Sequence, residues 1–205
     1  MPLTPTLSPK GRGSKSANLN SRMLVRSAIE HDLPGIAEIV NRAILETTAH
    51  FATEPDTIEE VREHWLASRD RFPWLVAVGS QAPAGPAGVL GFARASPWKS
   101  RCAYEWTAEI TVYVRPEHHR RGIGRSLYAR LIETLTRQGY RTLLAGIALP
   151  NDPSVALHEA MGMRHVGTLP RVGYKFGRWL DVGYWQLDLP AAQRQPTTIR
   201  AIDQI

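Results

Sequence analysis

The hydrophobic positions of the chain follow two different periods, and these predict two kinds of element. Apolar residues recur at helical spacing after Pro34, Thr57 and Gly124, which predicts three amphipathic helices. Alternating or continuous apolar residues predict strands from Leu24 onward and in WLVAV (74–78), VLGFARA (89–95), AYEWTAEITVYV (103–114), TLLAGIAL (142–149) and GYWQLDL (183–189). Because strands come first in pairs and then alternate with helices, we expect an α/β domain with a mixed sheet.

Capping residues and glycines predict where the helices begin and end. A polar side chain before a helix accepts a hydrogen bond from its first turn, and a glycine after it takes the left-handed conformation that stops it. We therefore expect starts at Asp32 with Pro34, at Thr57 with Glu60, at Gly124 and at Asp152 with Pro153, and stops at Gly139 and Gly162. Pro116 is expected to end the 103–114 strand, and residues 79–88 to form a flexible hairpin loop.

Charge and composition divide the chain into three parts. The formal net charge is +6, but residues 1–22 contain four basic side chains and no acid, so 21 basic and 19 acidic side chains remain. A domain that close to neutral is a weak candidate for nucleic-acid binding. Prolines and glycines in 1–22 would break the amphipathic helix of a transit peptide. We expect a disordered extension (1–22, with Met23 as an alternative start), one domain (23–189) and a flexible C-terminal tail (190–205).

Cysteine and histidine usage limits the chemistry. The single cysteine, Cys102, excludes an internal disulfide and a cysteine-based zinc cluster. His118 and His119 are adjacent, and adjacent histidines rarely bind one metal together, so we expect no metal.

No apolar run approaches the ~20 residues of a membrane-spanning helix, and we expect a reducing, cytoplasmic location.

The segment HHRRGIGRSLY (118–128) lies after a predicted strand and before a predicted helix. In that position, backbone N–H groups and the positive end of the helix can bind a phosphate. Gly122 and Gly124 allow the backbone to close around an anion. Three arginines add positive charge: Arg120, Arg121 and Arg125. The alternative is a solvated basic turn whose glycines only start a helix.

Two nucleotide-binding motifs do not fit this segment. The dinucleotide fingerprint G-x-G-x-x-G requires a glycine at position 127, which is leucine, and it belongs near the first strand. The G-K-[ST] of a P-loop is absent.

HRRGIG resembles the pyrophosphate loop Q/R-x-x-G-x-G/A of the GCN5-related N-acetyltransferases (GNAT), with His119 in place of the usual Gln or Arg. Four further stretches resemble the phosphinothricin and methionine sulfoximine acetyltransferase branch: PWLVA, WKSRCAYEWTAEITVYV, LPNDPSVALHEAMG and GRWLDVGYWQLDL. The likeness runs from about Arg26 to Leu189.

This resemblance implies the GNAT fold, with a mixed, twisted sheet splayed between its fourth and fifth strands and flanking helices. It implies acetyl-CoA as co-substrate, with its pantetheine arm in the splay. The residues implied for the coenzyme are Val112, Tyr113, Val114, Arg120, Arg121, Gly122, Ile123, Gly124, Arg125 and Asn151. Asn151 would equally suit a turn before Asp-Pro.

Acetyl transfer to an amine requires a base, because a primary amine is largely protonated at neutral pH. The resemblance implies that Glu109, in the TAE motif, is this base; the alternative is a solvent-facing strand glutamate. His158 occupies a position where the wider superfamily has a tyrosine that protonates the thiolate. It would donate that proton or orient the base relay, and the alternative is a packed helix histidine.

The resemblance also implies substrate contacts and an assembly state. A substrate with a second oxyanion needs cationic partners, for which we expect Lys99 and Arg101, although both also suit a solvated loop. The family's other substrate-contact positions are Phe51, Tyr104, Glu105, Trp106 and Thr107, which would equally suit a core. A homodimer is implied.

We therefore expect an acetyl-CoA-dependent N-acetyltransferase that modifies the α-amino group of phosphinothricin, methionine sulfoximine or methionine sulfone by direct transfer. The alternatives are the same chemistry on another small amine or a protein N-terminus, and a non-catalytic coenzyme A sensor.

Overall fold

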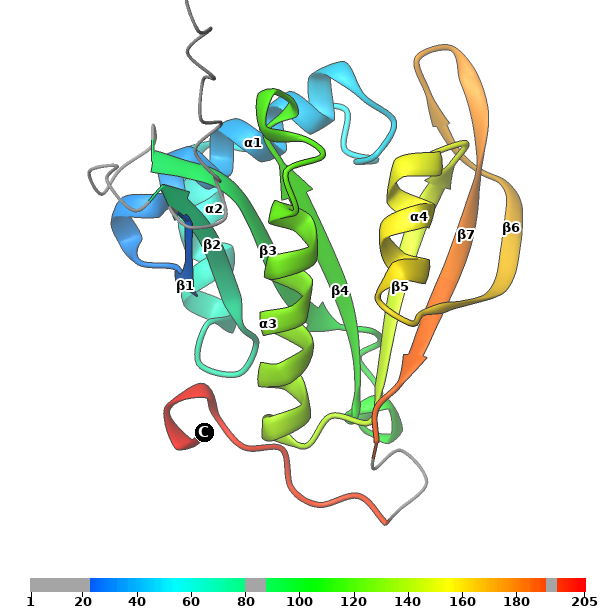
Figure 1. Ribbon diagram of the computed structural model, residues 1–205. Helices are drawn as coiled ribbons and strands as arrows, with labels where there is room; N and C mark the ends of the chain where they lie inside the picture. Colours follow the sequence, from blue (N-terminus) through cyan, green and yellow to red (C-terminus); the bar gives the residue numbers. More distant parts are fainter. Residues whose placement is uncertain (1–22, 80–87, 191–194) are drawn as a thin grey trace, which may run out of the picture.

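The computed structural model describes residues 23–79, 88–190 and 195–205, which include a seven-stranded sheet. The strand order is β1-β2-β3-β4-β5-β7-β6, and the β4–β5 pair is parallel while the other pairs are antiparallel (Figure 1). The strands are β1 (Met23–Ser27), β2 (Trp74–Gly79), β3 (Val89–Pro97), β4 (Thr107–Val114), β5 (Thr142–Leu149), β6 (Arg164–Lys175) and β7 (Arg178–Asp188). The expected mixed α/β sheet is confirmed.

Helices cover both faces of this sheet. They are α1 (Leu33–Glu46), α2 (Ile58–Ser68), α3 (Ile123–Gln138) and α4 (Asp152–Ala160). The buried face of α1 and α2 packs on Trp74, Val76 and Phe92, whereas α3 and α4 pack on the opposite face (Figure 1). Because side chains alternate along a strand, Glu109, Thr111 and Tyr113 of β4 share the α1 face.

The predicted helix boundaries hold where local hydrogen bonding sets them. Thr57 and Glu60 form the expected capping box of α2. Gly139 ends α3 with φ 105°. The prediction that the Asp32 side chain caps α1 is wrong. Its carboxylate is buried and instead accepts hydrogen bonds from Arg26 (2.6 and 2.9 Å) and from the Ile29 N–H (2.9 Å), because a buried carboxylate needs a cation.

Two strands differ from the sequence expectation. The strand expected at 103–114 begins only at Thr107, since Cys102–Tyr104 form a 3-10 helix. The edge strand β6 was not predicted. It does not alternate cleanly between apolar and polar residues, and its register with β7 shifts between Leu169 and Gly173, a stretch that contains Pro170.

Residues 195–205, which we expect to be a flexible C-terminal tail, make hydrogen bonds to the domain. The Trp106 indole donates to the Thr197 carbonyl (2.6 Å), Arg200 N–H donates to the Gln138 carbonyl (2.9 Å), and Ile202 N–H donates to the Asp70 carbonyl (3.0 Å). These contacts hold the segment across the end of α3. Residues 1–22, 80–87 and 191–194 lie outside the described residues, and so do the predictions about them.

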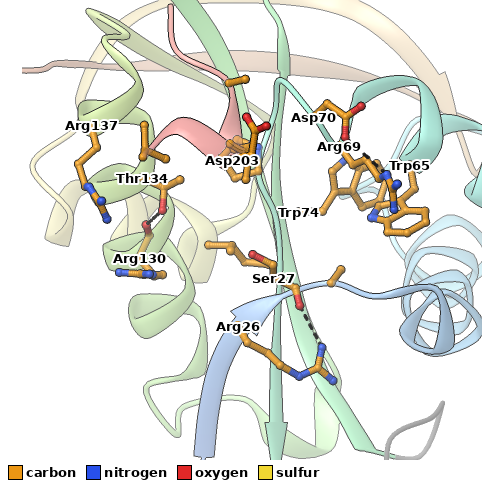
Figure 2. A pocket seen from close by; sticks show the side chains of 16 residues that line it. Arg26, Ser27, Trp65, Arg69, Asp70, Trp74, Arg130, Thr134, Arg137 and Asp203 are labelled. Carbon is orange, nitrogen blue, oxygen red and sulfur yellow. Dashed lines mark hydrogen bonds and ion pairs between the residues drawn. The ribbon is translucent and has the colours of Figure 1, made fainter.

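A cavity of about 550 Å³ lies beside this C-terminal segment. Figure 2 shows it between α3, which carries Arg130, Thr134 and Arg137, and residues 65–70, which include the C-terminal end of α2. Asp203 of the segment lines the same cavity. The segment therefore forms part of the wall between α2 and α3.

Candidate active site

The sheet opens between β4 and β5. Their parallel register covers only three pairs, Thr107 with Thr142, Ala108 with Leu143 and Glu109 with Leu144, and the strands then diverge (Figure 1). The expected splay between the fourth and fifth strands is thus confirmed. Beyond Glu109, the β5 side of β4 has no strand partner among the described residues, so its backbone groups are available to a ligand.

A cavity of about 750 Å³ occupies this opening. It is lined on one side by Ile110–Val114 of β4 and on the other by Gly146–Ala148 of β5 and by α4. Of the residues expected to bind the coenzyme, the cavity brings together Val112, Tyr113, Val114, Arg120, Gly122, Ile123, Gly124, Arg125 and Asn151. Arg121 does not line it.

The glycine turn at the start of α3 forms one end of this cavity. Arg120 (φ 57°) and Gly122 (φ 78°) are left-handed, and Gly122 precedes α3 without any side-chain cap. The first N–H groups of a helix lack acceptors within the helix, and successive N–H groups in such a turn form an anion-binding concavity. The turn therefore suits a phosphate.

One hydrogen bond holds this turn in place, and one glycine leaves room for the neighbouring helix. His119 Nε2 donates a hydrogen bond to the Val114 carbonyl (2.9 Å), since a carbonyl oxygen can only accept. A Cβ on Gly124 would lie 3.1 Å from Cδ2 of Leu157, so a side chain at this position would press against α4. Gly124 thus allows both α3–α4 packing and access to the turn.

Glu109 lies where β4 and β5 separate. A Cβ on Gly146 would lie 3.6 Å from Glu109 Oε1, and Gly146 lines the cavity, so the carboxylate lies next to the cavity wall although Glu109 itself does not line it. Burial raises the pKa of Glu109, and the positive charges of Arg94 and Lys99 oppose that rise. A half-buried carboxylate with a raised pKa beside a cavity is a candidate general base.

His158 is buried and binds a second residue of the cavity wall. Its Nδ1 lies 2.7 Å from the Ser154 carbonyl, which can only accept, so Nδ1 bears the proton. Its Nε2 then accepts the hydroxyl of the buried Tyr128 at 2.8 Å. Burial lowers the pKa of His158 and raises that of Tyr128, so both groups are neutral at pH 7. In this state, the imidazole holds the Tyr128 hydroxyl and has no proton on Nε2.

Asn151 combines both sequence interpretations. Its Oδ1 accepts the Ser154 N–H (3.3 Å) and so caps α4. Asn151 also lines the cavity, and its amide NH₂ donates no hydrogen bond within the described part of the chain. The side chain can cap the helix and donate to a ligand at the same time.

The predicted substrate residues are scattered, and none of them lines this cavity. Lys99 lies over the Trp98 ring (4.8 Å to the centroid), and its charge reaches Glu109. Arg101 and Tyr104 are exposed. Thr107 pairs with Thr142 at the start of the parallel ladder.

Two of the predicted substrate residues have other partners. Glu105 pairs with Arg71 (3.1 Å), and the Trp106 indole donates to the C-terminal segment. The structure therefore does not bring Glu105 and Trp106 together with Glu109, because Glu105 binds Arg71 and Trp106 binds the C-terminal segment.

The loop after α1 contains Phe51 and lies against two other elements. The Tyr113 hydroxyl donates to the Ala49 carbonyl (3.1 Å). The buried Lys175 ammonium donates to the carbonyls of Ile44 and His50, both at 2.6 Å. Phe51 lies directly over Gly173, where a Cβ would overlap its ring. The β6–β7 hairpin thus fixes the loop beside Tyr113.

Sequence reasoning missed Tyr128, Lys175 and Arg94. Tyr128 follows the Leu127 stripe of α3 and has no sequence signal of its own. Lys175 lies in the strand that was not predicted. Arg94 did have a signal, namely a charge in the middle of the apolar strand VLGFARA, but its neighbours are set by sheet register.

Two features are absent from the described residues. These residues contain no group of three or more His, Cys, Asp or Glu side chains placed to hold a metal ion. None of their helices is long and apolar enough to cross a membrane.

Comparison with known proteins gives one consistent family. Residues 25–183 match the family model described as an acetyltransferase (GNAT) domain. The chain is 45% identical over 183 residues to a phosphinothricin N-acetyltransferase of Streptomyces viridochromogenes, covering 88% of this chain and 95% of that protein. It is 37% identical to an L-methionine sulfoximine/L-methionine sulfone acetyltransferase of Pseudomonas paraeruginosa, covering 84% and 98%.

A solved structure agrees with these relatives. The phosphinothricin acetyltransferase of Sinorhizobium meliloti, in complex with acetyl-CoA, superimposes with a TM-score of 0.79 at 30% identity, covering 86% of this chain and 94% of that one. The family model spans most of the chain, and the splayed sheet agrees with it. The chain belongs to the GNAT acetyltransferase family.

Proposed function

We propose that this protein transfers the acetyl group of acetyl-CoA to the α-amino group of phosphinothricin or a related analogue such as methionine sulfoximine or methionine sulfone. The observation that carries the proposal is the Glu109 carboxylate beside Gly146, a residue that lines the cavity in the β4–β5 splay. The names of the two relatives above support the substrate class.

The residues of the splay fit acetyl-CoA. The pantetheine arm would lie along Val112–Val114, whose β5 side has no strand partner, and the diphosphate would bind the uncapped turn at Gly122. Arg120 and Arg125 line the same end, and Asn151 would donate its amide to the arm. The bound coenzyme supplies an acetyl thioester, the electrophile of the reaction.

Glu109 acts as the general base. The substrate ammonium gives one proton to the carboxylate, directly or through a water, and the resulting amine has the lone pair that attacks the thioester carbonyl. The C–N bond forms, the C–S bond breaks, and the second proton that the nitrogen loses goes to the departing thiolate of coenzyme A. Burial shifts the pKa of Glu109 toward neutral pH, and a carboxylate with a higher pKa is a better proton acceptor. Unpaired N–H groups of β4 that face the splay would polarise the carbonyl.

His158 acts as a positioning residue. Because its Nδ1 donates to Ser154 and its Nε2 accepts from Tyr128, the neutral ring fixes the direction of the Tyr128 hydroxyl in the cavity wall. The alternative role, proton donation to the leaving thiolate, would require an imidazolium, and burial lowers the pKa of His158. The geometry favours positioning.

The amino-acid substrate would approach Glu109 from the side of Lys99 and Arg101. The Trp98 and Tyr184 rings lie 5.3 Å apart edge to face, and Tyr184 also contacts Gly146, so these two aromatics wall the approach to Glu109. From the sequence alone, we retain Tyr104, Thr107 and Phe51 as further contacts. Transfer is direct within a ternary complex, and the exposed Cys102 has no role in it.

The test is thiol release from acetyl-CoA with a panel of amino acids. Phosphinothricin, methionine sulfoximine and methionine sulfone should be turned over with higher kcat/KM than the proteinogenic amino acids or a peptide N-terminus. Acetyl-CoA binding without turnover of any panel member would instead support the coenzyme A sensor. Expression in a glufosinate-sensitive bacterium should confer resistance.

We also propose a homodimer that works in the cytoplasm. The β6–β7 hairpin exposes a group of large apolar side chains: Val166, Leu169, Val172, Tyr174, Phe176 and Trp179. An exposed patch of this kind marks an interface more often than free surface. Sedimentation equilibrium should give twice the chain mass, and Trp179→Glu should shift it toward the monomer.

A further inference from the structure

We propose that Arg94 binds an oxyanion of the amino-acid substrate and so aligns its amino group with Glu109. This inference rests on the proposed function and adds the residue that selects for an anionic substrate. The oxyanion is either the α-carboxylate or the phosphinate of phosphinothricin, and the experiment below separates the two.

Sheet register places Arg94 next to the base. Arg94 of β3 lies opposite Thr111 of β4, and Ser96 lies opposite Glu109. Arg94 and Glu109 are therefore diagonal neighbours on the same face, a spacing that long side chains can span. Arg94 also lies opposite Trp74 of β2, and its guanidinium is 5.0 Å from the centroid of that ring.

The guanidinium is held by packing rather than by an acid. Within the described ranges, no carboxylate lies within 4.0 Å of Arg94 and no side-chain or backbone acceptor bonds it. Two other half-buried arginines are paired with an acid: Arg26 with Asp32 (2.6 Å) and Arg115 with Glu38 (2.5 Å). Leaving Arg94 without such a partner is costly, and an incoming anion would offset that cost.

The electrostatics agree with this geometry. Burial lowers the pKa of Arg94, and the negative charges of Glu109 and Asp56 only oppose this from a distance. A guanidinium presents several N–H donors in a plane and binds carboxylates or phosphinates in a bidentate manner. Arg94 therefore offers charge and unused donors beside the base, whereas Lys99 and Arg101 are exposed.

The experiment compares Arg94→Met and Arg94→Lys with Arg69→Met. Arg69 also stacks on a tryptophan, 4.4 Å from the Trp65 centroid, but lies away from Glu109, so it controls for loss of a stacked arginine. KM and kcat are measured with phosphinothricin and with methionine sulfone, which has the carboxylate but no second anion. Melting temperature and equilibrium binding of coenzyme A establish that each variant is folded and binds the coenzyme.

Arg94→Met should raise the amino-acid KM about 10- to 100-fold, the loss expected for a charged hydrogen bond. Arg94→Lys should recover part of it, and Arg69→Met should resemble wild type. An equal rise for both substrates assigns the α-carboxylate, and a rise for phosphinothricin alone assigns the phosphinate. An unchanged KM, or a fall in kcat alone, overturns the inference. A wild-type enzyme inactive on both substrates overturns the proposed function as well.

Discussion

The hydroxyl of Tyr128 donates a 2.8 Å hydrogen bond to Nε2 of His158, which joins α3 to α4 in the wall of the cavity between β4 and β5. Neither group is charged at neutral pH, because burial lowers the pKa of His158 and raises that of Tyr128. This pair places a neutral hydroxyl in the cavity wall, with its proton directed at Nε2 of His158.

Tyr128→Phe should lower kcat and destabilise the fold. The substitution leaves Nε2 of His158 buried without a partner, which costs about 1–3 kcal/mol. Thermal unfolding and steady-state kinetics check both effects. If His158 acts only through Tyr128, the double variant Tyr128→Phe/His158→Asn will be no slower than the more impaired single variant. Additive losses would give His158 a separate chemical role.

Glu109→Gln should lower kcat by about 10²–10⁴-fold while leaving acetyl-CoA affinity unchanged, because the amide cannot accept the substrate proton. Turnover like that of wild type would remove Glu109 as the base.

The pH profile tests the same residue. The ionised carboxylate is the active form, and its pKa is raised by burial, so kcat/KM should fall as the pH drops through a value above 4.5. A raised pKa of an acid also means that ionised Glu109 lowers stability at neutral pH, a penalty that disappears as the pH falls. Glu109→Gln should therefore melt at a higher temperature than wild type at pH 7, and at about the same temperature near pH 4.

Gly122→Ala should weaken acetyl-CoA binding before it changes the amino-acid KM. Gly122 has φ 78° at the turn, so a Cβ strains the backbone and crowds the anion site. Gly139→Ala is the matched control, since Gly139 is also left-handed (φ 105°) but ends α3 at its far end. Both variants should lose similar stability, and only Gly122→Ala should lose coenzyme affinity by isothermal titration.

Lys175→Met should raise the amino-acid KM with little change in the acetyl-CoA KM. The ammonium of Lys175 bonds the carbonyls of Ile44 and His50, and its loss frees the loop that contains Phe51. Hydrogen exchange over residues 47–56 should increase in the variant. Unchanged exchange there would show that Tyr113 and Phe51 hold the loop without Lys175.

Removal of residues 191–205 should lower the melting temperature by several degrees. The Trp106 indole and the buried Gln138 amide would lose their partners Thr197 and Arg200. The Trp106 bond is exposed and the Gln138 amide keeps its hydrogen bond to the Arg71 carbonyl, so each lost hydrogen bond should cost about 0.5–1.5 kcal/mol. Removal of residues 1–22 is the comparison, and it should leave both melting temperature and activity intact.

The amino-acid sequence by itself determined the local features. The Thr57–Glu60 capping box, the glycines that begin and end α3, and the strands from 74 to 114 follow from periodicity and backbone preference, which act between neighbours in the chain. The motifs around Gly122 and Glu109 likewise gave the family and the expected splay.

Only the tertiary structure decided which side chains meet. Arg94 lies beside Glu109 because of the β3–β4 register, Lys175 reaches Ile44 across 131 positions, and Tyr128 finds His158 on another helix. The C-terminal segment likewise packs against the end of α3, and Asp32 binds Arg26 instead of the helix backbone. These contacts depend on packing between distant segments, which no local pattern records.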